Sequence, residues 1–387
     1  MQPTASIWSE INEAFRLWMS GDARSARARF EALIAAAWVH PYLDLGLAYS
    51  CRDTGDLDGA LAAAERLLAA EPMNPLAMII KADVIAARGD ERAAVSLYAN
   101  AARVTPPGDL APMLRAELSR AAAAVETYAG RAAGWMDRQL EEAGVLAEAS
   151  PRFLQSLAIA RRERRVYQQR PIRYFFPGLP LIEFYERRDF PWTAMLEASV
   201  GTIREEAERV LSDPQRLTPY VADDGAPGSG PGDLTGSRQW TAFFLWQSGQ
   251  VVEENARLCP RTMDVLRELP LAHVPGATPS VLFSVLAPGA HIPPHNGMLN
   301  TRLICHLPLI TPPGCSLRVG GETREWRYGE TLIFDDSIEH EAWNRSDQTR
   351  VVLLFDVWRP ELTDVERRAV AAYLTAQARF EQQPPPP

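Results

Sequence analysis

The feature that most constrains the fold is an internal repeat in the first part of the chain. Three segments, "GDARSARARFEALIAA", "GDLDGALAAAERLLAA" and "GDERAAVSLYANAARV", begin at Gly21, Gly55 and Gly89, at intervals of 34 residues. Each segment has an alanine five positions after its glycine. A small residue that recurs at one position lets paired helices approach closely, and Gly-Asp suits the turn between them. The repeat therefore favours stacked helix pairs over a helical bundle in which this spacing is accidental.

The spacing of the repeat resembles that of tetratricopeptide repeats. The recurring alanines are Ala26, Ala60 and Ala94. Pro41 and Pro75, which are also 34 residues apart, mark the joins between units. The resemblance implies two-helix units that stack and share a core, and helical patterning continues to about residue 168. We therefore expect an α-helical repeat domain over residues 1–168, whose concave surface would present a peptide or protein partner.

The second part of the chain has a different composition, because proline and aromatic residues replace alanine from about residue 170. One helix is expected over residues 192–213. Short strands are expected over residues 240–247, 280–288, 301–310, 315–321, 322–328, 330–336 and 350–358. Many short strands joined by Gly and Pro turns predict a double-stranded β-helix, or jelly roll, over residues 169–380.

Two further segments are expected to lack regular structure. Residues 222–237, "ADDGAPGSGPGDLTGS", are rich in Gly, Pro and Asp. A loop of this length inside a compact domain is usually a functional lid or a disordered segment, and a lid is a plausible interpretation here. The proline-rich tail, residues 381–387, is expected to be disordered.

Composition excludes several classes of partner. The formal net charge of −9 argues against a nucleic-acid-binding protein, which normally has a basic face. No apolar run approaches the roughly 18 residues needed to span a membrane. The N-terminus lacks the basic start and apolar core of a secretory signal. Because the four cysteines are scattered, we expect reduced thiols in a cytoplasmic protein.

Four of the six histidines fall between residues 291 and 340. His295 follows the strand expected over residues 280–288, and His340 follows the strand expected over residues 330–336. Both would lie at strand ends, where the mouth of a jelly roll is. A lone histidine is more often a hydrogen-bonded core residue than a ligand, but two at equivalent strand ends favour a metal site. His291 is interpreted as structural.

An arginine accompanies this histidine pair. Arg350 begins the apolar strand expected over residues 350–358. A buried guanidinium there needs an anionic partner, and its planar fork suits a carboxylate such as that of 2-oxoglutarate. The alternative is an internal salt bridge with Asp335, Asp336 or Asp356.

Longer motifs make a family resemblance specific. The motifs are "RYFFPGLP" (173–180), "HNGMLNTRLICHLPLI" (295–310), "GETLIFDDSIEHEAWN" (329–344) and "RVVLLFDVWRPEL" (350–362). Together they resemble the aspartyl/asparaginyl β-hydroxylase family, over roughly residues 170–365. Members of that family are iron(II)- and 2-oxoglutarate-dependent oxygenases of double-stranded β-helix fold, and some carry tetratricopeptide repeats before the catalytic domain.

The resemblance implies a metal site. His295 and His340 resemble the two iron ligands. Gly297 matches the family's departure from the usual His-x-carboxylate arrangement, so water or substrate would take the third position. Asp336 lies where an acidic residue could hydrogen-bond a metal-bound water and so partly replace the missing charge. Trp343 would pack near the iron.

The resemblance also implies how 2-oxoglutarate binds. Arg350 and Ser284 resemble the pair that hold its distal carboxylate, and His306 resembles the residue that meets its other carboxylate. The better-known peptide hydroxylases of the family have arginine at both positions that match Arg302 and Ile304. Only Arg302 is present here, so the substrate and the anchoring of the near end of 2-oxoglutarate are left open.

The implied activity is hydroxylation of an unactivated C–H bond with dioxygen, at the β-carbon of an aspartyl or asparaginyl residue in a peptide or protein. One alternative is a lipid acyl chain or a small metabolite as substrate. Another is halogenation, since an iron centre without its carboxylate can bind chloride. Two alternatives belong to other classes of protein. They are a catalytically inactive repeat scaffold and a non-enzymatic cupin-type sugar binder.

Overall fold

A computed structural model of the chain describes residues 5–221 and 234–381. Contacts divide the chain into two compact units, Met1–Arg161 and Arg162–Pro387. This division falls close to residue 168, where the helical pattern predicted the end of the repeat domain. Most of the expected lid loop (222–233) and the expected tail from residue 382 lie outside the described residues.

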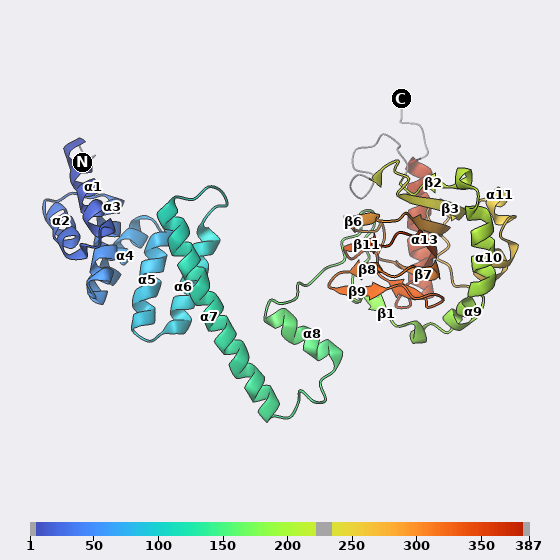
Figure 1. The fold of residues 1–387 in the computed structure, drawn as a ribbon, viewed down its shortest axis with the longest axis horizontal. Coiled ribbons are helices and arrows are strands. Elements are labelled where there is room, and N and C mark those ends of the chain that lie inside the picture. Colours follow the sequence, from blue (N-terminus) through green and yellow to red (C-terminus); the bar gives the residue numbers. More distant parts are fainter. Residues whose placement is uncertain (1–4, 222–233, 382–387) are drawn as a thin grey trace. The chain divides into compact units, whose positions relative to one another are not determined.

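The N-terminal unit is a series of α-helices, and consecutive helices from α1 to α7 pack against each other (Figure 1). They are α1 (Ala5–Met19), α2 (Ala23–Ala35), α3 (Pro41–Asp53), α4 (Leu57–Ala70), α5 (Pro75–Ala87), α6 (Glu91–Val104), α7 (Pro112–Glu142) and α8 (Pro151–Ala160). The predicted helical repeat is thus confirmed. Pro41 and Pro75 each occupy the first turn of a helix, where a missing N–H costs nothing.

The Gly-Asp pair of each repeat ends one helix and begins the next. Gly21, Gly55 and Gly89 have φ angles of +91°, +82° and +92°, in the left-handed region that glycine adopts without strain. The aspartate that follows each glycine then caps the next helix, as when Asp22 accepts a hydrogen bond from the backbone N–H of Ser25. Asp56 and Asp90 do the same. The Gly-Asp dipeptide therefore forms the connection between consecutive helices of the repeat.

Small residues set how closely the repeat helices pack. Ala26, Ala60 and Ala94 are all fully buried. A Cβ at Gly46 in α3 would lie only 2.2 Å from the ring of Phe30 in α2, so this glycine lets the two helices meet through an aromatic ring. Phe30 and Leu43 can therefore lie in one buried cluster between α2 and α3.

The C-terminal unit contains two antiparallel sheets. The larger, eight-stranded sheet has the order β1-β10-β7-β12-β5-β3-β2, with β4 paired to β3, and the smaller sheet has the order β6-β11-β8-β9. The strands are β1 (Phe184–Tyr185), β2 (Thr218–Pro219), β3 (Trp240–Gln247), β4 (Gln250–Val251), β5 (Val281–Leu286), β6 (His291–His295), β7 (Arg302–Ile310), β8 (Cys315–Val319), β9 (Glu322–Glu325), β10 (Leu332–Phe334), β11 (His340–Asn344) and β12 (Arg350–Trp358). The predicted jelly roll is confirmed.

Helices cover the large sheet on the side away from the small sheet. They include α9 (Trp192–Ala198), α10 (Val200–Leu211) and α12 (Pro260–Arg267), while α11 (Glu253–Ala256) and α13 (Asp364–Glu381) complete the unit (Figure 1). The single helix expected over residues 192–213 is interrupted at Ser199, giving α9 and α10. Within the described residues, no helix is long and apolar enough to cross a membrane.

The central strands β7 and β12 are buried on both faces, and alternate residues face opposite layers. On β12, Leu353 and Phe355 pack toward the helices, whereas Val352 and Leu354 pack between the two sheets. Arg350 and Asp356 lie an even number of residues from Val352 and Leu354, so their side chains also point into the space between the two sheets. This alternation places charged side chains inside the jelly roll.

The segment just after residue 161 should stabilise the C-terminal unit. Arg164 forms an ion pair with Glu183 at 2.7 Å, and Tyr167 packs on the inter-sheet core beneath the Arg318 guanidinium. A fragment of residues 168–387 should therefore have a free energy of unfolding about 1–3 kcal/mol lower than a fragment of residues 162–387. Urea denaturation of both fragments measures this, and equal midpoints would contradict the role given to these residues.

Candidate active site

Two histidines meet where β6 ends and β11 begins. His295 and His340 are directly opposite each other in the antiparallel pair, and their ring centroids are 4.1 Å apart. The Nδ1 atom of His295 lies 2.8 Å from the carbonyl oxygen of Pro293, and that of His340 lies 3.0 Å from the carbonyl oxygen of Ile338. Since a carbonyl only accepts, each Nδ1 carries the hydrogen, and each Nε2 keeps its lone pair for a metal.

Both imidazoles are held in the neutral form that binds metals. Burial lowers the pKa of His295, although the hydrogen bond to Pro293 opposes this. Burial and the neighbouring His295 lower the pKa of His340 well below its usual value. Among the described residues, no cluster of three His, Cys, Asp or Glu side chains is arranged to hold a metal. A metal here would have two protein ligands.

The position of Asp336 explains why residue 297 is a glycine. A Cβ built on Gly297 would lie 1.9 Å from Oδ2 of Asp336, closer than any real contact. The backbone N–H of Gly297 also donates to the carbonyl oxygen of Asp336 at 2.6 Å. The Asp336 carboxylate thus fills the space in which a side chain at residue 297 would begin. A carboxylate is present beside the histidine pair, but it comes from the loop after β10.

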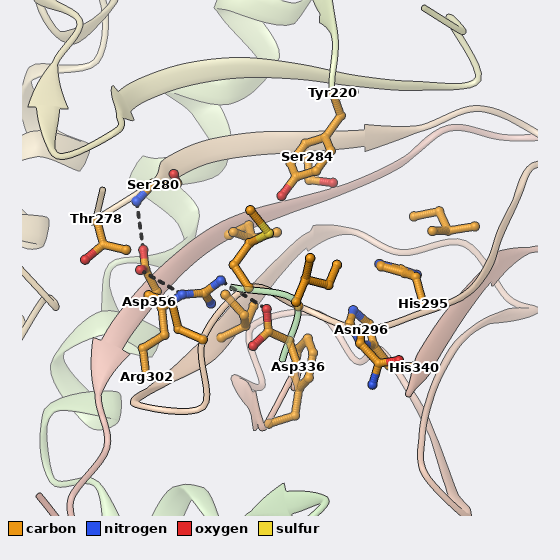
Figure 2. Close-up of a pocket in the computed structure, with 18 of the residues that line it drawn as sticks. Tyr220, Thr278, Ser280, Ser284, His295, Asn296, Arg302, Asp336, His340 and Asp356 are labelled. Carbon is orange, nitrogen blue, oxygen red and sulfur yellow. Dashed lines mark hydrogen bonds and ion pairs between the residues drawn. The ribbon is translucent and has the colours of Figure 1, made fainter. Parts of the chain in front are cut away.

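Arg302 on β7 lies between two buried carboxylates (Figure 2). Its Nη2 donates to Oδ2 of Asp336 at 3.1 Å, and its Nε is 3.5 Å from Oδ2 of Asp356 on β12. The other oxygen of Asp356 accepts from the backbone N–H of Ser280 at 2.8 Å. Burial raises the pKa of both Asp336 and Asp356 to about 6, although Arg302 opposes the shift.

Arg350 has no carboxylate partner among the described residues. It is 1% exposed, its Nη1 is 3.4 Å from the Ser284 hydroxyl, and its guanidinium lies over the Trp326 ring. The possible internal partners are otherwise engaged: Asp335 pairs with Arg359, while Asp336 and Asp356 flank Arg302. Burial lowers the pKa of Arg350 to about 10. The internal salt bridge considered from the sequence is therefore excluded.

His306 presents a further unsatisfied donor. The indole Nε1 of Trp326 donates to Nδ1 of His306 at 3.2 Å, so the hydrogen of the neutral imidazole is on Nε2. That Nε2 is buried and has no hydrogen-bond partner. Burial, Arg350 and His340 together lower the pKa of His306 well below its usual value. His306 can thus donate one hydrogen bond to a ligand beside Arg350.

These side chains line one cavity of about 810 Å³. Both candidate metal ligands, Asp336, Arg302, Ser284, His306 and Arg350 all contribute to its wall, so the structure brings together seven of the eight residues that the sequence singled out. Apolar side chains, including Ile304, Phe334 and Leu354, separate the polar groups. The cavity has the size and the mixed lining typical of small-molecule sites.

Trp343 is the exception, and the expectation that it packs near the metal is corrected. Its ring stacks on His291 with centroids 5.3 Å apart, and it does not line the cavity. Residues alternate along β11, so Trp343 points away from the face that carries His340. The Nε2 atom of His291 lies 3.0 Å from a carboxylate oxygen of Glu341 on the same outer face, which agrees with the interpretation of His291 as structural.

Sequence reasoning missed two cavity residues, Asp356 and Trp240, as members of the site. Asp356 had been considered only as a partner for Arg350, although its spacing of six residues from Arg350 puts both on one face of β12. Trp240 donates from Nε1 to the Ser284 hydroxyl at 3.0 Å and thus orients it. No local pattern marks Trp240, because its partner is on another strand.

A buried network supports the loops that carry Gly297 and Asp336. Arg359, which is fully buried, donates to Asp335 Oδ2 at 2.7 Å and to the Tyr185 hydroxyl at 2.6 Å. Gln169 donates to the same carboxylate at 2.8 Å and accepts from Asn300 at 3.0 Å. The segment around Gln169 is thereby tied to the loop before β7 and to the loop after β10.

The fold and site define the C-terminal unit as a jelly-roll domain with a pair of facing histidines and a buried arginine that has no carboxylate partner among the described residues. Residues 197–360 match the family model described as Aspartyl/Asparaginyl beta-hydroxylase. Three curated relatives agree with this match. The ornithine lipid ester-linked acyl 2-hydroxylase of Rhizobium tropici is 36% identical over 181 residues, 46% of this chain and 60% of the relative.

The human aspartyl/asparaginyl beta-hydroxylase is 40% identical over 179 residues, 46% of this chain and 22% of the relative. The human aspartate beta-hydroxylase domain-containing protein 2 is 33% identical over 205 residues, 52% of this chain and 54% of the relative. The chain thus matches about three fifths or less of the length of each of these relatives. Residues 197–360 are thus similar to the aspartyl/asparaginyl β-hydroxylase family, in agreement with the resemblance of the sequence motifs.

The steric exclusion between Gly297 and Asp336 can be tested by a double-mutant cycle. Gly297→Ala should lower the free energy of unfolding by about 1–3 kcal/mol, because the Asp336 carboxylate must move. In an Asp336→Ala background the same substitution should lower the free energy of unfolding by a smaller amount, because the atoms that Cβ would overlap are absent. Denaturant unfolding of the four proteins gives the coupling energy, and strictly additive effects would contradict direct contact.

The metal assignment predicts different outcomes for His340, a member of the pair, and for His291, which lies outside it. His340→Ala should abolish binding of a divalent metal while the protein stays folded, because one imidazole cannot hold the ion alone. His291→Ala, on the outer face, is the matched control and should keep the affinity. Calorimetric titration with iron(II) under nitrogen measures both. Wild-type affinity in the His340 variant would contradict its role as a ligand.

Proposed function

We propose that the chain is an iron(II)- and 2-oxoglutarate-dependent dioxygenase that hydroxylates an unactivated C–H bond. The proposed target is the β-carbon of an aspartyl or asparaginyl residue in a peptide or protein. The observation that carries the proposal is the Arg350 guanidinium, which is buried in the cavity without a carboxylate partner among the described residues.

A buried cation in this state needs a ligand anion. Burial of an unpaired charge is costly, and a carboxylate that accepts two parallel N–H bonds offsets that cost. The Ser284 hydroxyl is adjacent to the guanidinium and is held there by Trp240. In the proposed complex, Arg350 and Ser284 bind the distal carboxylate of 2-oxoglutarate.

The other end of 2-oxoglutarate would meet His306. The hydrogen on its Nε2 is buried and available, and the ring is held by the Trp326 indole. The apolar Ile304 side chain cannot supply a charge at the neighbouring position. One neutral donor from His306, together with the metal, would therefore orient the near carboxylate.

The two histidines fit iron(II), because both present a neutral imidazole with its Nε2 free. Asp336 would add the negative charge that a third protein ligand usually provides. When bound, iron(II) and 2-oxoglutarate would supply the activation of dioxygen, with succinate and carbon dioxide as products. The task of the chain is to orient the substrates and to keep water away from them.

The N-terminal repeats support a peptide or protein as the substrate. Stacked helix pairs commonly bind extended chains. The human relative named aspartyl/asparaginyl beta-hydroxylase is compatible with this class of substrate. Remote binding of this kind would help to orient the reacting residue in the cavity.

A lipid acyl chain is the second candidate substrate. One relative is named an ornithine lipid ester-linked acyl 2-hydroxylase. The apolar cavity residues Ile292, Ile304, Leu317, Phe334 and Leu354 would also suit an acyl chain. The two candidates predict different products in a cell extract.

The experiment that tests the proposed function combines two measurements. Succinate formation should require both iron(II) and 2-oxoglutarate. Mass spectrometry of peptides and of lipids, incubated with and without the enzyme, should then find products heavier by one oxygen atom. Modified peptides support the first candidate and modified lipids the second. If no succinate forms under any condition, an inactive scaffold replaces the proposed enzyme.

The role of Arg350 predicts a specific kinetic defect. Arg350→Ala should weaken 2-oxoglutarate binding by about 2–4 kcal/mol while iron stays bound, because a charge-assisted contact is lost. Arg345→Ala is the matched control, since Arg345 is exposed and lies over the outer-face Trp343 ring. The Michaelis constant for 2-oxoglutarate checks this. An unchanged constant would assign Arg350 to structure alone.

A further inference from the structure

The C-terminal helix α13 has a second apolar face that the fold itself does not bury. On its inner face, Val370 and Leu374 pack with Val274 and Leu299 in one buried cluster. A surface helix normally has polar residues on the side away from the core. The outer face of α13 instead carries an exposed apolar stripe, which consists of Val365, Ala369, Ala372, Tyr373, Ala376 and Phe380.

These residues, the outer stripe, form one continuous surface. They follow one another at intervals of one, three or four residues, the spacing that keeps side chains on one side of a helix. The large side chains are well exposed, with Val365 at 65%, Tyr373 at 56% and Phe380 at 74%. A contiguous exposed apolar surface of this kind is typical of an interaction site.

The order of large and small residues in the outer stripe favours another helix as the partner. An amphipathic helix that lies on a bilayer has large apolar side chains along its whole apolar face. In the outer stripe, alanines separate Val365, Tyr373 and Phe380. A second helix with the same order can place its large side chains over these alanines and approach closely. The stripe is therefore complementary to a copy of itself.

Charges along one flank of the outer stripe also match a second copy. Asp364, Arg368 and Arg379 lie on the same flank, because they are four and eleven residues apart, about one and three helical turns. The Asp364 side chain is 85% exposed and lies 3.6 Å from Arg367. Arg368 and Arg379 are exposed and have no ion-pair partner among the described residues.

The positions of these charges select an antiparallel arrangement. A two-fold axis perpendicular to the helix pair brings the same flank of both helices together, with opposite ends side by side. Asp364 of each copy then lies beside Arg379 of the other, and the two helix dipoles are opposed. In a parallel pair each charge would instead lie at the level of the identical residue, where it has no complementary partner.

We propose that the outer stripe of α13 packs antiparallel, with two-fold symmetry, against α13 of a second copy of this chain. The dissociation constant should be roughly 1–100 µM, because one helix face buries less surface than a standard interface. This contact does not rest on the proposed function, and α13 (Asp364–Glu381) lies beyond the residues 197–360 that the family model matches.

Sedimentation velocity of the full-length chain, from about 5 to about 500 µM at low ionic strength, measures the association. Wild-type protein should change from monomer to dimer over this range. Ala372→Glu places two like charges near the two-fold axis and should raise the dissociation constant about tenfold or more. Ala194→Glu, at an exposed alanine of α9, is the matched control and should leave the dissociation constant unchanged. Circular dichroism checks that both variants are folded.

Reversal of the flank charges tests the antiparallel arrangement. Asp364→Arg and Arg379→Asp should each raise the dissociation constant about threefold or more, because each places like charges together in both symmetric pairs. The double variant restores both pairs with reversed polarity, so its dissociation constant should return to within about twofold of wild type. Effects on the stability of α13 itself would instead accumulate in the double variant.

Each result supports or overturns the contact. A chain that stays monomeric at all concentrations overturns it, whether the N-terminal unit, a bilayer or another protein covers the outer stripe. A dimer that Ala372→Glu leaves intact uses another surface, which also overturns the proposal. If the dimer depends on Ala372 but the double charge reversal does not recover it, the antiparallel arrangement is wrong.

Discussion

The site depends on the pairing of β7 with β12 at the centre of the large sheet. Both strands are buried on both faces, so every second residue must be apolar where the helices pack. The intervening residues face the small sheet, and there the chain places Arg302, His306, Arg350 and Asp356 among apolar neighbours. The alternation of side chains along each strand, together with the register that places Leu354 opposite His306, brings these four residues onto one surface.

Two groups of buried charge in this domain differ in how completely they are bonded. Arg359 and Asp335 belong to a network in which carbonyls, a hydroxyl and an amide surround the ion pair. Arg302 and Arg350, by contrast, each have donor atoms without a partner. A satisfied network fixes loops in one arrangement, whereas unsatisfied atoms are costly unless a ligand meets them. The first group is therefore structural, and the second is the basis for inferring ligands.

Much of this organisation could be predicted from the sequence, and the failures have physical causes. The repeat could be recognised in the sequence because Gly21, Gly55 and Gly89 each end a helix through their own backbone conformation, which does not depend on distant residues. The strands β6 and β11 were missed because "HIPPH" and "HEAWN" are short and their pairing partners are distant in sequence. Trp343 was misplaced for the same reason, since its face of the strand depends on that pairing. The relation between Gly297 and Asp336 requires three-dimensional contact, which no local pattern contains.

The hydrogen bonds of the two candidate metal ligands have a consequence for how this domain tolerates substitution. His295 and His340 are each oriented by the carbonyl two residues earlier in their own chain segment. No side-chain replacement deletes a main-chain carbonyl, so drift in the surrounding sequence leaves the orientation of both rings intact. His306 is oriented instead by the indole of Trp326, which a single substitution removes. Substitutions should therefore be tolerated more readily around His295 and His340 than around His306.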